Sequence, residues 1–306
     1  MVTMYFPCNI YLIIEVDFLV SIIIIKLSMK PSWLKVKLPR DDNYQYVKDT
    51  LSQEKLNTVC IEAKCPNRIE CWGRKAMTFM ILGNVCTRNC MFCAVETGDP
   101  KGFVDKSESG KIARIVKELS LSYVVITSVT RDDLTDGGAS VFAEAIKIIR
   151  KYNQNIRIEI LVPDFSCDES SIKTVIDAGC DVFSHNLETV ERLTPLVRDK
   201  KASYQVSLQV LDTARKIKSE LITKSGFMLG LGETEEEVKQ TIRDLQKIGV
   251  QVLTIGQYLQ PKKHLLQVVD YVKPEKFTYY KEYALTNGFK KVSAGPLVRS
   301  SYFFVN

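Results

Sequence analysis

The chain has 306 residues, of which 45% are hydrophobic and 25% charged, and its formal net charge is +6. This balance is typical of a folded globular protein and argues against a chain dominated by disorder. The lysines alternate with glutamates along helical stretches instead of gathering on one face, so we expect no nucleic-acid binding.

The N-terminal segment, residues 1–29, differs from the rest in composition. Residues 9–25 are strongly apolar, but Glu15 and Asp17 interrupt them, and each would cost about 2.5 to 3.5 kcal/mol near a bilayer centre. The segment also lacks a leading basic region and a small-residue cleavage site, which a secretory signal requires. We therefore expect a non-core extension, no stable membrane insertion, and a main fold that begins after Met29.

Three regions are predicted beyond this extension. Residues 30–76 have little periodicity and form an N-terminal extension that carries three cysteines. Residues 77–290 alternate β-rich runs with amphipathic runs and form the main domain. Residues 291–306 form a short C-terminal segment.

The main domain has a regular alternation of strand and helix patterns. The predicted strands are Thr78–Leu82, Tyr123–Val129, Ile156–Val162, Val182–Leu187, Thr223–Leu229 and Val252–Leu259. The predicted helices are Lys111–Leu121, Ala139–Lys151, Glu169–Ala178, Tyr204–Ser219, Thr234–Ile248 and Pro274–Leu285. Thr234 with Glu237 predicts a capping box, and Asp168 predicts an N-cap. The alternation predicts an α/β fold of parallel βαβ units, but it does not separate an incomplete barrel from an open doubly wound sheet.

Cysteine usage predicts a metal site in a reducing compartment. Six of the nine cysteines fall between Cys60 and Cys93, whereas a secreted disulfide protein would spread them through a smaller fold. We therefore expect a cytoplasmic protein. The scattered Cys8, Cys167 and Cys180 have no sequence partners and are predicted not to take part.

Cys86, Cys90 and Cys93 form the first cysteine triplet, directly after the predicted strand Thr78–Leu82. Ligands bind at this edge of parallel α/β sheets, outside the carboxyl ends of the strands. Three thiolates suit an iron–sulfur cluster in which one iron lacks a protein ligand, and a vacant position is what a catalytic metal needs. The alternatives are a zinc site with a fourth ligand from elsewhere, or an electron-carrying cluster with a distant fourth cysteine.

This spacing, with Phe92 before the last cysteine, resembles the signature of the radical S-adenosylmethionine superfamily. The resemblance implies a partial (β/α)6 barrel. It also implies an open iron that binds the methionine part of S-adenosylmethionine, which is cleaved to a 5′-deoxyadenosyl radical.

Cys60, Cys65 and Cys71 form the second cysteine triplet, which alone indicates only a further metal site. Its position ahead of the first triplet resembles the lipoyl synthase family specifically. The similarity covers roughly residues 30–302, with matching segments at 30–35, 78–83, 123–129, 131–134, 136–138, 161–165, 185–188, 224–226, 230–234 and 256–261. It implies two 4Fe-4S clusters and S-adenosylmethionine as cofactors, with the auxiliary cluster on the second triplet.

The C-terminal segment resembles the Arg-Ser-Ser-Tyr signature of the same family at residues 299–302. The resemblance implies that Ser301 is the fourth ligand of the auxiliary cluster. A serine oxygen is a harder ligand than a thiolate and should leave iron more readily, which suits a cluster that gives up sulfur. The chain departs from the family by stopping at Asn306, where a short helical tail usually follows.

Three further residues are candidates for cofactor contacts. Asn186 and Glu188 end the fourth predicted strand and are expected to reach the adenosyl part, the alternative being a structural role. Arg131 follows the second predicted strand and is expected at the cofactor or cluster, the alternative being a surface ion-pair loop.

The family resemblance implies a sulfurtransferase that inserts two sulfur atoms at C6 and C8 of a protein-bound octanoyl-lysine, with sulfur from the auxiliary cluster. The implied partners are octanoylated lipoyl-carrier domains of 2-oxoacid dehydrogenase complexes or the glycine cleavage H protein, a reducing electron donor and a cluster-repair protein. Another sulfur-inserting radical enzyme, such as biotin synthase, and a non-catalytic iron–sulfur electron carrier are the rival interpretations.

Overall fold

The computed structural model describes residues 30–34 and 42–301, in two units that are treated separately, residues 1–35 and 36–306. The first unit contains the short 3-10 helix η1, Ser32–Leu34. The expected extension 1–29 lies outside the described residues. Within the described ranges, no helix combines the length and apolar character that crossing a membrane requires.

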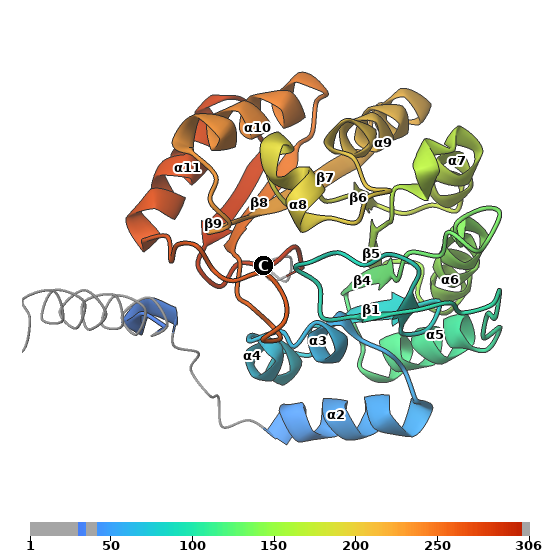
Figure 1. Ribbon diagram of the computed structural model, residues 1–306. Helices are drawn as coiled ribbons and strands as arrows, with labels where there is room; N and C mark the ends of the chain where they lie inside the picture. Colours follow the sequence, from blue (N-terminus) through green and yellow to red (C-terminus); the bar gives the residue numbers. More distant parts are fainter. Residues whose placement is uncertain (1–29, 35–41, 302–306) are drawn as a thin grey trace, which may run out of the picture. The chain divides into compact units, whose positions relative to one another are not determined.

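The second unit is built on a sheet of seven parallel strands arranged in chain order, with β1 and β9 at its edges (Figure 1). The strands are β1 (Thr78–Ile81), β4 (Tyr123–Ser128), β5 (Arg157–Leu161), β6 (Val182–Ser184), β7 (Ile222–Leu229), β8 (Val252–Gln257) and β9 (Lys291–Gly295). The α/β fold with a parallel sheet is confirmed, and all six predicted strands are present. The seventh strand, β9, was not predicted because its sequence, Lys-Val-Ser-Ala-Gly, contains a single buried hydrophobic residue, Val292.

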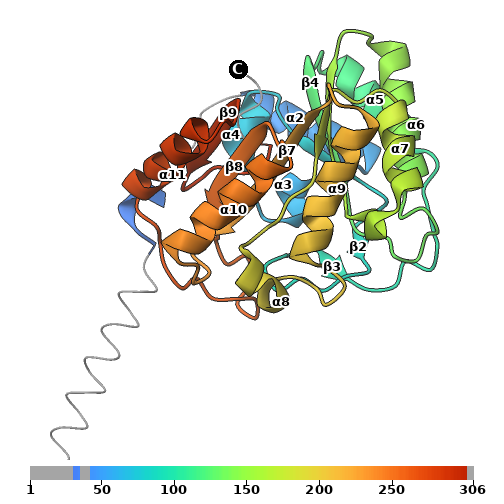
Figure 2. The same cartoon turned by 90° about the horizontal axis from the view of Figure 1, so that it is seen from above.

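Helices connect successive strands and lie along the outer side of the curved sheet (Figures 1 and 2). They are α5 (Glu108–Glu118), α6 (Ala139–Tyr152), α7 (Glu169–Asp177), α9 (Tyr204–Ile217), α10 (Glu235–Lys247) and α11 (Pro274–Thr286). The capping box of Thr234 and Glu237 is confirmed, and the Asp168 carboxylate accepts from the Ser171 amide as predicted. Short elements complete the connections: β2 (Val85–Cys86), β3 (Glu96–Thr97), η2 (Phe165–Cys167), η3 (Glu191–Leu193) and α8 (Thr194–Val197).

The segment before β1 folds into three helices that the sequence pattern did not predict. They are α2 (Asp42–Glu54), α3 (Val59–Glu62) and α4 (Arg68–Gly73). Val47 and Leu51 of α2 and Trp72 of α4 are buried in the same hydrophobic cluster as Phe79 of β1. Thr58, just before α3, pairs with Phe79 in an antiparallel bridge. The segment is therefore packed into the main domain and fixed to its first strand.

Candidate metal centre

The first cysteine triplet lies in the loop that follows β1, at the carboxyl end of the sheet. Cys86 belongs to β2, and Cys90 and Cys93 lie between β2 and β3, which pair in parallel. Burial, with smaller contributions from neighbouring thiols, raises the pKa of the Cys90 thiol to about 11 and that of the Cys93 thiol to about 12. The three sulfur atoms therefore share one partly desolvated space, as the spacing predicted.

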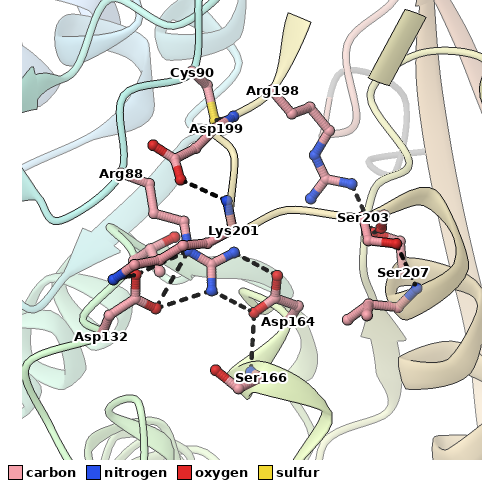
Figure 3. A network of polar contacts seen from close by, with 12 residues as sticks. Arg88, Cys90, Asp132, Asp164, Ser166, Arg198, Asp199, Lys201, Ser203 and Ser207 are labelled. Carbon is pink, nitrogen blue, oxygen red and sulfur yellow. Dashed lines mark hydrogen bonds and ion pairs between the residues drawn. The ribbon is translucent and has the colours of Figure 1, made fainter. Parts of the chain in front are cut away.

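The segment between α8 and α9 contacts this loop and holds it in place (Figure 3). The Asp199 amide donates to Cys90 Sγ at 3.3 Å, and the Asp199 carboxylate accepts from the Asn89 amide at 2.9 Å. The Met91 amide donates to the Val197 carbonyl at 2.9 Å. The loop conformation thus depends on backbone contacts more than 100 residues away in sequence.

Arg88, between the first two cysteines, anchors the loop to the strand ends (Figure 3). Its guanidinium donates to Asp132 after β4, at 2.9 and 3.0 Å, and to Asp164 after β5, at 2.8 Å. Lys201 also pairs with Asp132, at 3.2 Å. Arg88 and Asp164 are almost fully buried, so the pair is a fixed support for the loop. Sequence reasoning missed Arg88 and Asp164. The signal that could have pointed to Arg88 is a charged residue between two cysteines of one motif.

A strained turn presents Asp164 to Arg88. The three residues after Asp164 all have left-handed backbone angles, with φ of 46° at Phe165, 52° at Ser166 and 58° at Cys167. This conformation costs roughly 1–2 kcal/mol per residue in an L-amino acid. The Asp164 carboxylate accepts from the Ser166 amide at 3.0 Å, which stabilises the turn. Strain of this kind concentrates at functional sites.

Asn186 and Glu188 follow β6, and Glu188 lies beside Cys90 and Cys93 of the first triplet. Burial raises the pKa of the Glu188 carboxyl, an effect that Arg198 and Asn186 partly offset, and this carboxylate in turn raises the pKa values of Cys90 and Cys93. Glu188 has φ 69°, which is rare outside glycine. Asn186 Oδ1 is buried and has no hydrogen-bond partner. Asn186 therefore carries an acceptor atom that the protein itself leaves unused.

Arg131 lies in a different setting from Asn186 and Glu188. Its side chain is fully buried and donates twice to Asp133, at 2.7 and 2.8 Å, and once to the Leu82 carbonyl, at 3.2 Å. It therefore connects the end of β1 to the loop after β4. A cofactor contact for Arg131 stays a prediction.

The second triplet is carried by α3 and α4. Burial, with a smaller contribution from Cys65, raises the pKa of the Cys60 thiol to about 11 and that of the Cys71 thiol to about 12. The three thiols therefore form a second group of neighbours, separate from the first in sequence and carried by different elements.

The C-terminal segment returns from β9 to the second triplet. The Leu297 carbonyl accepts from Asn67 Nδ2 at 2.6 Å, and Asn67 lies between Cys65 and Cys71. Burial lowers the pKa of the Arg299 guanidinium, and the adjacent Cys65 thiol partly offsets this effect. The residues that precede Ser301 are therefore held against the triplet for which Ser301 was predicted as the fourth ligand.

The surroundings of the triplets fit iron–sulfur clusters. Around the second triplet, Arg68 Nε and Trp72 Nε1 are buried donors without a hydrogen-bond partner, and sulfide ions would accept from them. Buried thiols with raised pKa values need a positive partner to ionise, which iron supplies. Among the described residues, no three His, Cys, Asp or Glu side chains are grouped to hold a single ion.

Comparison with known proteins identifies two matching families. The model of the radical SAM superfamily matches residues 80–245, and that of the N-terminal domain of lipoyl synthase matches residues 26–65. The lipoyl synthase of Caldicellulosiruptor saccharolyticus is 52% identical over 275 residues, covering 90% of this chain and 96% of the relative. The lipoyl synthase of Thermus thermophilus is 50% identical over 273 residues (89% and 84%), and the mitochondrial lipoyl synthase of Drosophila willistoni is 49% identical over 277 residues (89% and 74%).

Solved structures support the fold. Methylornithine synthase has a TM-score of 0.55 at 13% identity, covering 74% of this chain and 75% of its own. The FeFe-hydrogenase maturase HydG from Carboxydothermus hydrogenoformans has a TM-score of 0.53 at 14% identity (74% and 62%). At these identities the likeness concerns the architecture alone.

Proposed function

The chain belongs to the lipoyl synthase family of the radical S-adenosylmethionine superfamily, and from this premise we propose how its residues divide the work of that enzyme. Cys86, Cys90 and Cys93 hold the cluster at which S-adenosylmethionine binds. The second triplet and Ser301 hold the auxiliary cluster. When bound, these groups supply a radical able to remove hydrogen from unactivated carbon, and sulfide for insertion at C6 and C8 of an octanoyl-lysine.

At the first site the protein's work is positioning. Three thiolates leave one iron without a protein ligand, and this vacancy suits the amino and carboxylate groups of S-adenosylmethionine. Asn186 Oδ1 and the Glu188 carboxylate would accept hydrogen bonds from the cofactor, a role supported by the unpartnered amide oxygen and by the proximity of Glu188 to Cys90 and Cys93. Arg88, fixed by Asp164, keeps the loop from shifting when the cofactor binds.

At the second site the ligand set combines stable and labile members. Three thiolates match the softness of iron in a cluster, whereas the Ser301 oxygen is harder and leaves more readily. Arg68 and Trp72 would donate to sulfide from the protein side. The contact of Asn67 with the Leu297 carbonyl supports the approach of the C-terminal segment to this site.

The substrates and location follow from the family. We infer that the octanoyl chain arrives on a lipoyl-carrier domain of a 2-oxoacid dehydrogenase complex or on the glycine cleavage H protein. A reducing electron donor and a cluster-repair protein complete the cycle. The gathering of six cysteines into two triplets typical of metal ligation supports a reducing compartment such as the cytoplasm.

The observation that carries this proposal is the folding of both cysteine triplets into separate groups, one beside Glu188 and the other beside the C-terminal segment. The test compares Cys65→Ala with Cys90→Ala in anaerobically reconstituted protein, measuring iron, 5′-deoxyadenosine and lipoylated carrier. The native chain should hold about eight iron atoms. Cys65→Ala should keep about four, release 5′-deoxyadenosine and make no lipoyl product.

Cys90→Ala should lose both 5′-deoxyadenosine and product. Cys180→Ala is the matched control, because Cys180 is a buried cysteine outside both triplets, and it should retain both activities. Loss of 5′-deoxyadenosine in Cys65→Ala, or a native chain with a single cluster, would contradict the division of roles. A non-catalytic electron carrier would release no 5′-deoxyadenosine in any form.

A further inference from the structure

A buried ion pair crosses the sheet beneath the C-terminal segment. Lys224 Nζ in β7 lies 2.7 Å from Glu159 Oε1 in β5, and the two side chains are 1% and 0% exposed. Ser184 in β6 donates to the same carboxylate oxygen at 3.1 Å, and the Tyr123 hydroxyl in β4 donates to the other. Four adjacent strands therefore contribute to one polar network inside the fold.

Such a network is not required to hold a sheet together. Removing two charges from water is costly, and well-packed hydrophobic residues often replace a buried ion pair without loss of stability. Successive side chains of a strand point to opposite faces, so Glu159 lies on the face opposite to Ile158 and Ile160, which belong to a hydrophobic cluster. A fully buried lysine and glutamate on the other face of the sheet therefore call for a role beyond packing.

The lysine makes a second contact that indicates this role. Lys224 Nζ also donates to the Ser300 carbonyl, 76 residues further along the chain. Asn186 Nδ2 donates to the Ser300 hydroxyl at 2.8 Å. Ser300 is thus bound at its main chain and at its side chain, and the next residue is Ser301.

The rest of the segment has few other anchors. Within residues 296–301, Val298 is the one buried hydrophobic residue, and Leu297 is held through its carbonyl by Asn67. Ordering a short polar segment costs conformational entropy, and a charge-assisted hydrogen bond offsets part of that cost. A serine oxygen is a harder ligand for iron than a thiolate, so contacts from the protein are expected to share the work of holding the segment.

We propose that Lys224, oriented by Glu159, is a positioning residue that fixes the Ser300 main chain so that the Ser301 hydroxyl reaches the auxiliary cluster. This inference rests on the proposed function, since it assigns Lys224 to the ligand arm of the second site. In this role Lys224 acts on the second site through its contact with Ser300.

The test uses the full-length, anaerobically reconstituted chain. Lys224→Met removes the donor but leaves the Glu159 carboxylate buried without its cation, so the double variant Glu159→Gln, Lys224→Met is the main one. Tyr123→Phe is the matched control, because it removes a hydrogen bond to the same carboxylate without touching the Lys224–Ser300 contact. The readouts are hydrogen–deuterium exchange of residues 297–301, the rate at which a chelator removes iron, and 5′-deoxyadenosine release.

In the double variant, exchange in residues 297–301 and release of auxiliary-cluster iron should each become at least about tenfold faster. Release of 5′-deoxyadenosine should stay within about twofold of the native rate while lipoyl product falls. Tyr123→Phe should match the native chain in the tail exchange and iron-release measurements. Unchanged tail exchange in the double variant overturns the proposal. Faster exchange spread evenly over β4 to β7 also overturns it, since the pair would then serve only the sheet.

Failure of the proposed function would look different. A native chain that binds one cluster however it is reconstituted would remove the second site itself. The tail exchange of the variants, measured also before reconstitution, would still report whether Lys224 holds Ser300.

Discussion

His185, directly after β6, has both ring nitrogens engaged. Nδ1 lies 2.9 Å from the Val162 carbonyl and Nε2 lies 3.0 Å from the Ser207 hydroxyl. Because a carbonyl only accepts, Nδ1 carries a proton and donates to Val162. Burial, with a smaller contribution from the nearby Arg198, lowers the pKa of His185 to about 4. The ring is therefore neutral at neutral pH and connects β5 to α9.

This pKa predicts a pH dependence of stability. Between pH 6.5, the ordinary value, and about 4, the unfolded chain binds a proton at this site and the folded chain does not. The stabilisation is complete above pH 6.5 and is lost as the pH falls toward 4, by up to about 3 kcal/mol. Anaerobic denaturant unfolding at pH 7.5 and 5 would measure it. His185→Gln should reduce this difference, and an unchanged difference would exclude His185 as its source.

At the scale of elements, strand β8 and the C-terminal segment approach each other closely at Gly256. A Cβ atom at this position would overlap the carbonyl oxygen of Val298 and contact the Arg299 side chain. The glycine therefore allows the segment to pass directly over the strand on its way to the second triplet.

Gly256→Ala should displace the segment and selectively weaken the auxiliary cluster. We expect iron to fall from about eight toward about four per chain while 5′-deoxyadenosine release persists. Gly110→Ala is the matched control, because Gly110 lies within α5 with no atom within 4 Å of the added methyl. That change should raise the unfolding free energy by about 0.5–1 kcal/mol and leave the iron content unchanged. Full iron content in Gly256→Ala would contradict the close approach.

The elements that the sequence predicted correctly share a physical property. Strands such as β4 and β5 are buried on both faces and read as apolar runs, and α10 has both an apolar stripe and a capping box. In contrast, α2 contributes two buried hydrophobic residues to the core, Val47 and Leu51, one turn apart. So narrow a stripe does not stand out from a polar background, and a strand with one buried residue, such as β9, does not either.

On the scale of the whole molecule, the segment before β1 and the segment after β9 meet at one site. Helix α3 contacts the first edge strand, β1, next to the bridge between Thr58 and Phe79, while the C-terminal segment follows the other edge strand, β9 (Figure 1). The hydrogen bond from Asn67 to Leu297 joins residues 230 positions apart. A cluster bound here would therefore connect the opposite edges of an open sheet.

Removing the metal should loosen these two ends together. After chelation of the clusters, hydrogen exchange should become faster in residues 57–76 and 296–301, because a ligand stabilises most the segments that hold it. The strands β4 to β7 should keep their protection, since their core does not depend on the metal. Loosening of one segment alone, or of all strands equally, would contradict a cluster shared between the two ends.

The sequence alone determined the order of the six strands from β1 to β8 and of the helices that follow them, the two cysteine triplets and the family to which the chain is similar. These features are local, since hydrophobic periodicity and thiol spacing are properties of neighbouring residues. Only the tertiary structure decided that Asp164 supports Arg88 and that Lys224 holds Ser300. In each case 76 positions separate the partners, and contacts over such distances leave no periodic signal because they arise from how the strands pack side by side.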